Sequence, residues 1–112
     1  MEKIFSFKIL GKKYKLKVKE CKSFFLKGKG LIFSKNSCPL LFIFKKETNN
    51  SIHSFFCRPF IAIWFNETNI VDIRSVKSWE YSIKPKRRYN KLLEIPINNE
   101  NYKTILDGMR KI

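Results

Sequence analysis

The residues best suited to nucleophilic catalysis gather around the only histidine of the 112-residue chain. Ser54 follows His53 directly, so in an extended chain the two side chains point to opposite faces and cannot form a serine–histidine pair. Cys57 shares the face of His53 but lies about 13 Å further along a strand, which is too far for proton transfer unless Pro59 folds the chain back. The spacing gives little support to an enzyme, and no catalytic residue is assigned.

The three cysteines raise the question of a metal site. Cys21, Cys38 and Cys57 are widely spaced and form no Cys-X-X-Cys motif. With His53 they could converge on zinc, but buried free thiols in a reducing compartment explain them better, because nothing in the spacing suggests a zinc site. We expect no metal, no cofactor and no disulfide framework.

One acidic residue stands in an unusual place. Glu94 lies within the apolar run Leu92–Pro96, where a carboxylate should meet a cation or a backbone amide, with Arg58 and Arg74 as candidate partners. Glu94 is therefore either half of a structural ion pair or the acidic end of a ligand pocket. Gly28-Lys29-Gly30 is too short for a phosphate-binding P-loop.

The charge of the chain indicates either an anionic partner or a surface on which lysine has no specific role. The formal net charge is +15, and thirteen lysines but only two acidic residues fall in residues 1–46. Such a field attracts nucleic acid, anionic lipid or an acidic partner. Abundant lysine, asparagine and isoleucine also fit an AT-rich genome, in which lysine is simply the default surface residue.

Two segments are candidates for a nucleic-acid surface. The first is an expected strand whose alternate residues Lys13, Lys15, Lys17 and Lys19 face one side, and its alternative is an edge strand that lysine protects from aggregation. The second is a proline-containing loop with Lys84, Lys86, Arg87 and Arg88, next to Tyr89 as a residue for base stacking. Neither an RNP pattern nor a KH-type loop, two common RNA-binding motifs, is visible.

The elements that must position these residues are mostly short strands. The apolar stretch 52–65 predicts two core strands, about 52–57 and 60–66, with a kink or bulge at Arg58-Pro59. Residues 3–10 and 13–19 alternate as a hairpin around Gly11-Lys12. Leu40–Phe44 is typical of a strand buried on both faces, joined to the central stretch by a hairpin loop.

Further expected elements complete the chain. Residues 70–75 alternate with Ile70, Asp72 and Arg74 on one face, and 76–83 and 92–96 are further strand candidates. Residues 99–106 predict a helix that ends before Gly108. The whole pattern predicts a mainly β fold, a compact β-sandwich or barrel-like single domain over residues 1–112, with one or two short helices.

Three blocks of sequence occur in a characteristic order and spacing. They are Lys29–Phe33, then Leu41–Phe44 followed by Ile52–Phe65, and Leu92–Pro96. Together they resemble the family called domain of unknown function 192, especially its archaeal branch, over roughly residues 20–97. The resemblance implies a compact β-sandwich or barrel-like fold with little helix, and no assigned reaction.

The chain departs from that family at several polar positions. Ser34 stands where the family usually has arginine, and Phe60-Ile61-Ala62 stands where it usually has a motif that ends in aspartate. Asp107-Gly108 reverses the common Gly-Asp. If the polar residues of the family form a site, this member has lost part of it.

The sequence as a whole predicts a cytoplasmic binding domain that is not an enzyme. A cleft for a small or anionic ligand, or for a protein partner, is expected from His53, Phe56, Arg58 and Glu94 beside Gly30 and Ser34. The alternative is binding of RNA or single-stranded nucleic acid through the lysine-rich surface. The chain shows neither a signal peptide nor a transmembrane segment, so a membrane partner is not expected.

Overall fold

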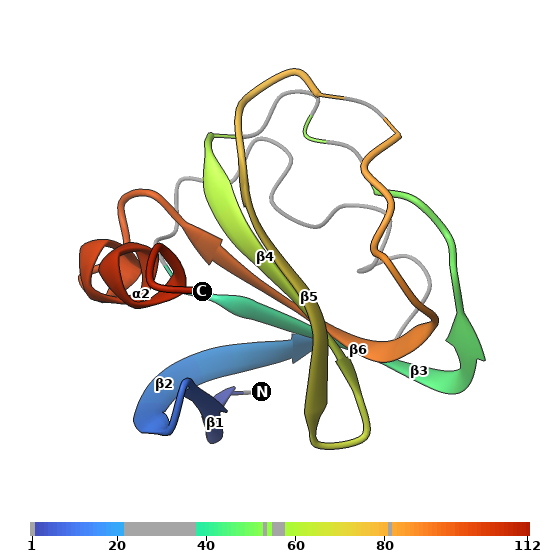
Figure 1. Ribbon diagram of the computed structural model, residues 1–112, viewed down its shortest axis with the longest axis horizontal. Helices are drawn as coiled ribbons and strands as arrows, with labels where there is room; N and C mark the ends of the chain where they lie inside the picture. Colours follow the sequence, from blue (N-terminus) through green and yellow to red (C-terminus); the bar gives the residue numbers. More distant parts are fainter. Residues whose placement is uncertain (1, 22–37, 53, 55–57, 81) are drawn as a thin grey trace.

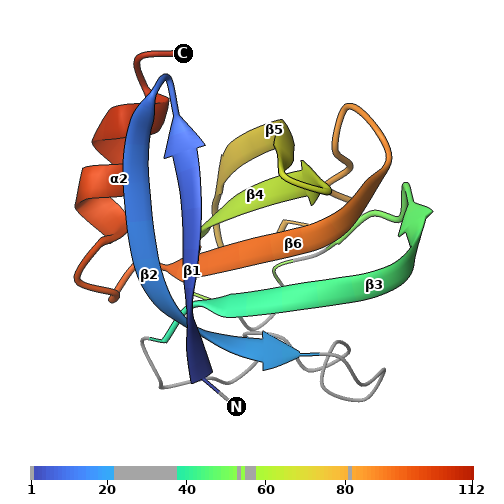
Figure 2. The same ribbon diagram turned by 90° about the horizontal axis from the view of Figure 1, so that it is seen from below.

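Six strands form one sheet that curls into a half-barrel (Figures 1 and 2). The computed structural model describes residues 2–21, 38–52, 54, 58–80 and 82–112. The spatial order of the strands is β1-β2-β3-β6-β4-β5. The elements are β1 (Glu2–Ile9), β2 (Lys12–Cys21), β3 (Leu40–Thr48), β4 (Phe60–Asn66), β5 (Asn69–Val76), β6 (Tyr89–Pro96) and the helix α2 (Tyr102–Met109). The mainly β architecture predicted from the sequence is confirmed.

The N-terminal hairpin forms as its alternation predicts. β1 and β2 pair antiparallel around a tight turn in which Leu10 and Gly11 both have positive φ, 49° and 84°. The four alternate lysines of β2 are exposed, and the residues between them are buried. However, β2 is not an edge strand, because Lys19–Cys21 also pairs in parallel with Leu40–Phe42 of β3. The edge strand on this side of the sheet is β1.

Each face of the sheet carries its own hydrophobic cluster. The inner cluster includes Leu41, Ile61, Ile63 and Leu93, and α2 covers part of it with the fully buried Ile105. The outer cluster has the alternate residues of the same strands, namely Leu40, Phe42, Phe60, Ala62, Trp64 and Leu92, with Cys21, Val76, Ile83 and Tyr89. The strand 40–44 is thus buried on both faces at its start, as its continuous apolar run predicts.

The central apolar stretch contributes one strand where two were predicted. Residues 60–66 form β4, as expected. The predicted hairpin between 40–44 and 52–57 is wrong, because β3 continues to Thr48 and pairs with β6, whereas Ile52 bridges Ile83. Ser54 lies in no strand, and the remainder of 52–57 (residues 53 and 55–57) lies outside the described residues. Arg58 and Pro59 precede β4 without forming part of it.

A bulge changes the predicted faces of β5. Trp64 is opposite Asp72 but Phe65 is opposite Ile70, so Val71 is the extra residue. Ile70 and Ile73 therefore both pack against the inner cluster, whereas Val71 packs against the outer one. The strict alternation predicted for 70–75 is wrong at this point, since each residue inserted into one strand reverses the faces of those beyond it.

The strand predicted for 76–83 is also wrong within the described residues. Trp79 has a φ of +64°, and the segment turns around the buried Ser54 hydroxyl, which donates to Lys77 O (2.5 Å) and accepts from Glu80 N (2.7 Å). Lys77 and Glu80 form these hydrogen bonds in place of the backbone pairing of a strand. Tyr81 lies outside the described residues.

The helix α2 begins later and ends later than predicted. It runs through Gly108, which was expected to follow its end. A Cβ atom at Gly108 would overlap the hydroxyl group of Tyr14. Glycine at this position therefore allows the helix to lie close to β2, a packing role that local sequence does not reveal.

Candidate functional site

Of the six residues predicted to form the ligand cleft, Arg58 and Glu94 belong to the described residues; His53, Phe56, Gly30 and Ser34 lie outside them. Arg58 is exposed and Glu94 is buried. Glu94 is opposite Ala62 on β4, and Arg58 lies four residues before Ala62. Arg58 lies outside β4, and no ion pair joins it to Glu94.

Glu94 occupies the middle of the sheet, on the face of the outer cluster. Its strand neighbours are Leu40 on β3 and Ala62 on β4, and its own exposure is 6%. The central position of β6 explains the burial, because strands pair with it on both sides. The small side chain of Ala62 leaves more room beside the carboxyl group than a larger residue would.

No hydrogen bond or ion pair reaches the Glu94 carboxyl group from the described residues. Burial raises the pKa of this group from 4.5 to about 8, because the charged form loses its hydration. At neutral pH the carboxyl group is therefore mainly protonated, and it offers one O–H donor and one carbonyl acceptor. Unsatisfied buried acids of this kind are uncommon and call for a reason.

A second unsatisfied polar atom lies on the same face. Trp64 is fully buried, and its Nε1 has no hydrogen-bond partner among the described residues. The indole of Trp64 lies near the Tyr89 hydroxyl and opposes the rise in the pKa of Tyr89. The two groups do not reach hydrogen-bond geometry. Trp64 is opposite Leu92 on β6, so Trp64 and Glu94 are diagonal neighbours on one face.

Asp72 is a buried acid with the opposite surroundings. Its exposure is also 6%, but its carboxylate accepts hydrogen bonds from Ile73 N (2.9 Å), Lys86 N (3.1 Å) and the guanidinium of Arg74 (3.1 Å). Arg74, one of the partners predicted for Glu94, is therefore occupied by Asp72. It also lies over the Trp64 ring, 5.9 Å from the centroid. Asp72 was not singled out in the sequence: Arg74 lies two residues along the same strand, but the burial of Asp72 and its contact with Lys86 N arise only through the fold.

The two described thiols are poor nucleophiles. Burial raises the pKa of Cys21 and of Cys38 above the ordinary value, and both are free cysteines. The thiol rather than the thiolate is the dominant form at neutral pH. Among the described ranges, no group of three or more metal-binding side chains is found.

The two predicted basic segments differ in what surrounds them. The lysines of β2 are exposed, although Lys17 pairs with Glu2 at 3.2 Å. Arg88 and its neighbours 84, 86 and 87 are exposed as expected. Tyr89 is only 1% exposed, and burial raises its pKa to about 12 while its hydroxyl donates to Asn50 O (2.9 Å). The predicted stacking role of Tyr89 is wrong, because its ring is part of the outer cluster.

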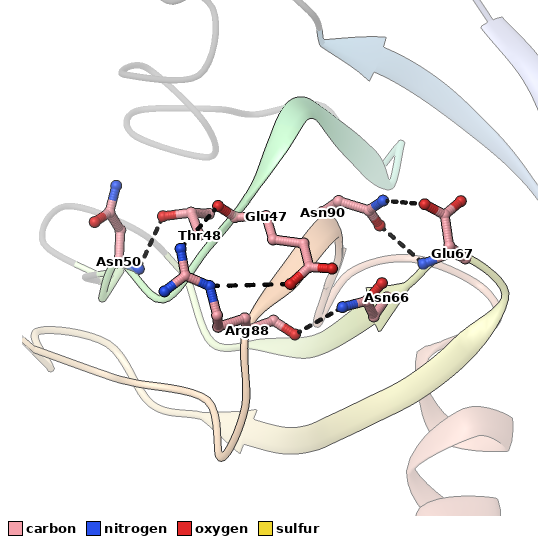
Figure 3. Close-up of polar contacts among 7 residues, drawn as sticks. All are labelled: Glu47, Thr48, Asn50, Asn66, Glu67, Arg88 and Asn90. Atoms are coloured by element: carbon pink, nitrogen blue, oxygen red, sulfur yellow. Dashed lines mark hydrogen bonds and ion pairs between the residues drawn. The ribbon is translucent and has the colours of Figure 1, made fainter.

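Arg88 belongs to a network that joins three strand ends (Figure 3). Its guanidinium contacts the side chain and the carbonyl oxygen of Glu47, at 3.9 Å and 3.4 Å, and its own carbonyl accepts from Asn66 Nδ2 (3.5 Å). Asn90 and Glu67 exchange two hydrogen bonds of 3.0 Å. The network fastens the end of β3 and the β4–β5 turn to the start of β6, which gives Arg88 a structural role.

These features define a small mainly β domain with, at the centre of its sheet, a buried acid that has no hydrogen-bond partner among the described residues. No helix of the described residues is long and apolar enough to cross a membrane. No protein-family model matches the chain.

Sequence relatives identify the family. The chain is 38% identical over 78 residues to a UPF0127 protein of Pyrococcus horikoshii, covering 66% of this chain and 67% of the relative. It is 32% identical over 90 residues to a UPF0127 protein of Pyrococcus furiosus, covering 77% of each. A UPF0127 protein of Thermococcus sibiricus is 31% identical over 100 residues, which are 85% of this chain and 64% of the relative. The chain belongs to the UPF0127 family.

Solved structures share the fold at low sequence identity. A candidate transcription regulator from Sinorhizobium meliloti superposes with a TM-score of 0.75 at 17% identity, covering 95% of this chain and 85% of the other. A protein of unknown function from Novosphingobium aromaticivorans gives 0.70 at 15% identity, covering 83% and 73%. At these identities the likeness concerns the fold alone.

Proposed function

We propose that this protein is a cytoplasmic binding module whose small ligand forms hydrogen bonds with Glu94. We also propose that the UPF0127 family and the family called domain of unknown function 192, which the sequence resembles, are one family. The proposal of binding rather than catalysis fits the protonated thiols of Cys21 and Cys38. His53, Phe56, Arg58, Gly30 and Ser34 complete the proposed cleft.

The single observation that carries the proposal is the buried carboxyl group of Glu94, which has no partner in the part of the chain that the structure describes. Burying a polar group without a partner costs about 1–3 kcal/mol in proteins. Leucine at position 94 would match the apolar neighbours Leu40 and Ala62, so stability alone does not explain a carboxyl group here. A ligand that offers both a donor and an acceptor would satisfy the protonated group. Of the two roles that the sequence left open for Glu94, this favours the ligand pocket.

The test compares two replacements of glutamate by leucine. Glu94→Leu removes the proposed contact, and Glu100→Leu makes the same chemical change at an exposed position. Native mass spectrometry would look for a ligand retained through purification, and thermal-shift measurements would screen a panel of carboxylic acids, amides and nucleosides. We expect a ligand that binds the wild type and Glu100→Leu but not Glu94→Leu. If no compound in either measurement depends on Glu94, the proposal is wrong.

Nucleic-acid binding is the second candidate, supported by the exposed alternate lysines of β2. The buried ring of Tyr89 weakens this candidate, because a buried ring cannot stack on a base. Trp79, by contrast, is 59% exposed. Titration of single-stranded RNA at two salt concentrations is the direct test. A steep loss of affinity at the higher salt, reduced by Lys15→Glu, is expected if this surface neutralises phosphates.

A further inference from the structure

A groove runs between the two edges of the sheet. β1 and β5 are the edge strands, and two adjoining cavities of about 390 and 400 Å³ lie between them. Both cavities are lined by Lys8 and Ile70, which makes them parts of one groove. β1 lines it with residues 6–9 and β5 with residues 69–73, so both edge backbones border the same space.

The groove has an apolar floor and an apolar mouth. Phe7, Ile9, Ile73 and Met109 line it from the inner cluster. At one end Leu10 is 67% exposed. Ile112, which lines the same cavity, is 71% exposed. Exposed apolar side chains gathered at a concave site are typical of a surface that another molecule covers.

The rim of the groove carries cations that form no ion pair within the part of the chain that the structure describes. Lys8 and Lys13 are directly opposite each other on β1 and β2, an arrangement of like charges that destabilises a hairpin. Lys86 lines the groove from the other side. None of these three lysines has an ion pair with a described residue. By contrast, Lys3 pairs with Glu20 and Lys17 with Glu2, further along the same hairpin.

An edge strand offers a template for a further strand. About half of the backbone N–H and C=O groups of β1 and β5 point away from the sheet, because each edge strand has a neighbour on one side only. Addition of an extended peptide to such an edge is a recurring mode of protein recognition. The acidic group in the groove, Asp72, is already engaged by Arg74 and by two backbone amides.

We propose that the groove between β1 and β5 binds an extended segment of a partner protein, with apolar residues on the floor alternating with acidic residues that pair with Lys8, Lys13 and Lys86. The period of two that a strand imposes would place every second side chain of the segment inward. This site is separate from the one at Glu94, and binding here does not depend on the proposed small ligand.

The experiment uses a short fluorescent peptide of alternating valine and glutamate. A matched peptide carries N-methylated valines, which keep the charge but remove N–H donors. Fluorescence anisotropy would compare the wild type with Lys13→Glu and with Lys103→Glu, an equal change of charge on the exposed face of α2. We expect Lys13→Glu to weaken binding about tenfold and Lys103→Glu to weaken it far less. The N-methylated peptide should bind at least tenfold more weakly than the parent.

The outcomes separate the groove from general attraction to a basic protein. Equal affinity for both peptides, or equal effects of the two lysine variants, would show that only the overall positive charge is at work, and would overturn the proposal. Single-stranded RNA that binds more tightly than the peptide and is lost in Lys13→Glu would also overturn it and assign the rim to nucleic acid. Glu94→Leu should leave peptide binding unchanged, so this proposal and that of the small ligand can fail independently.

Discussion

Two carboxyl groups on one face of the sheet, Asp72 and Glu94, are equally buried and yet have different surroundings. Asp72 lies on the edge strand β5, where Arg74 and the backbone of Lys86 can reach it. Glu94 lies on a central strand between apolar neighbours. The same residue chemistry therefore stabilises the fold at one place and opposes it at the other, and that difference marks Glu94 as a functional candidate.

The largest expected difference is in pH dependence. The folded-state pKa of Glu94 is raised to about 8 from 4.5, so the folded protein holds this proton more tightly than the unfolded chain does. The contribution of Glu94 to stability is then greatest at low pH and is lost as pH rises through this window, by up to roughly 1.4 kcal/mol per pH unit. Urea unfolding across the window should show the fall in the wild type but not in Glu94→Gln. If the free energy of unfolding falls with pH equally in the wild type and in Glu94→Gln, the raised pKa does not belong to Glu94.

The next effect concerns Asp72. Asp72→Ala leaves two backbone amides and a half-buried guanidinium without their acceptor, and we expect a loss of about 3 kcal/mol in the free energy of unfolding. Asp107→Ala is the control, because its ion pair with Arg110 is exposed and long at 4.0 Å. The control should cost less than about 0.5 kcal/mol. Equal effects of the two variants would remove the structural role given to Asp72.

A smaller effect of opposite sign is expected at position 94. At pH 5 the folded state carries a protonated Glu94, so Glu94→Leu removes an unsatisfied polar group without removing a charge. We expect a gain of about 1–2 kcal/mol in the free energy of unfolding. Chemical denaturation at this pH measures it, with Glu100→Leu as the exposed control. A loss of stability in Glu94→Leu would mean that the carboxyl group has a partner in the folded protein.

The smallest effect tests whether the two acids are independent. Arg74→Lys keeps the charge but loses the two-nitrogen contact with Asp72 and weakens the stacking on Trp64, at a cost of about 0.5–1 kcal/mol. The pH dependence that belongs to Glu94 should not move. If the midpoint of that dependence shifts in Arg74→Lys, the guanidinium also acts on Glu94 and the contrast between the acids is weaker than proposed.

Much of the fold could be predicted because it depends on local pattern. The alternation of β1 and β2 was read correctly, including which residues of β2 are buried and which lysines are exposed. The double burial at the start of β3 followed from its continuous apolar run. Three errors arose where a single residue changes the pattern: the bulge at Val71, the positive φ of Trp79, and Gly108 inside α2. The wrong hairpin had another cause, because β3 pairs with β6, which is distant in sequence.

The candidate site was predictable in part. An acid inside an apolar run singled out Glu94, and the structure shows that this residue is buried. The sequence offered Arg58 and Arg74 as partners, but Arg58 is exposed before the start of β4 and Arg74 is held by Asp72. Asp72 itself gave no signal, because an aspartate in an alternating strand is indistinguishable from an exposed one.

The sequence by itself determined which residues lie in the interior and which carry charge into water, since alternation and hydrophobic burial act over a few residues. Only the tertiary structure decided which strands are neighbours: β3 lies between β2 and β6, and β6 between β3 and β4. Asp72 has its cation, Arg74, two residues along its own strand, but the burial of both acids depends on those long-range pairings, because strand neighbours that are distant in sequence supply their surroundings.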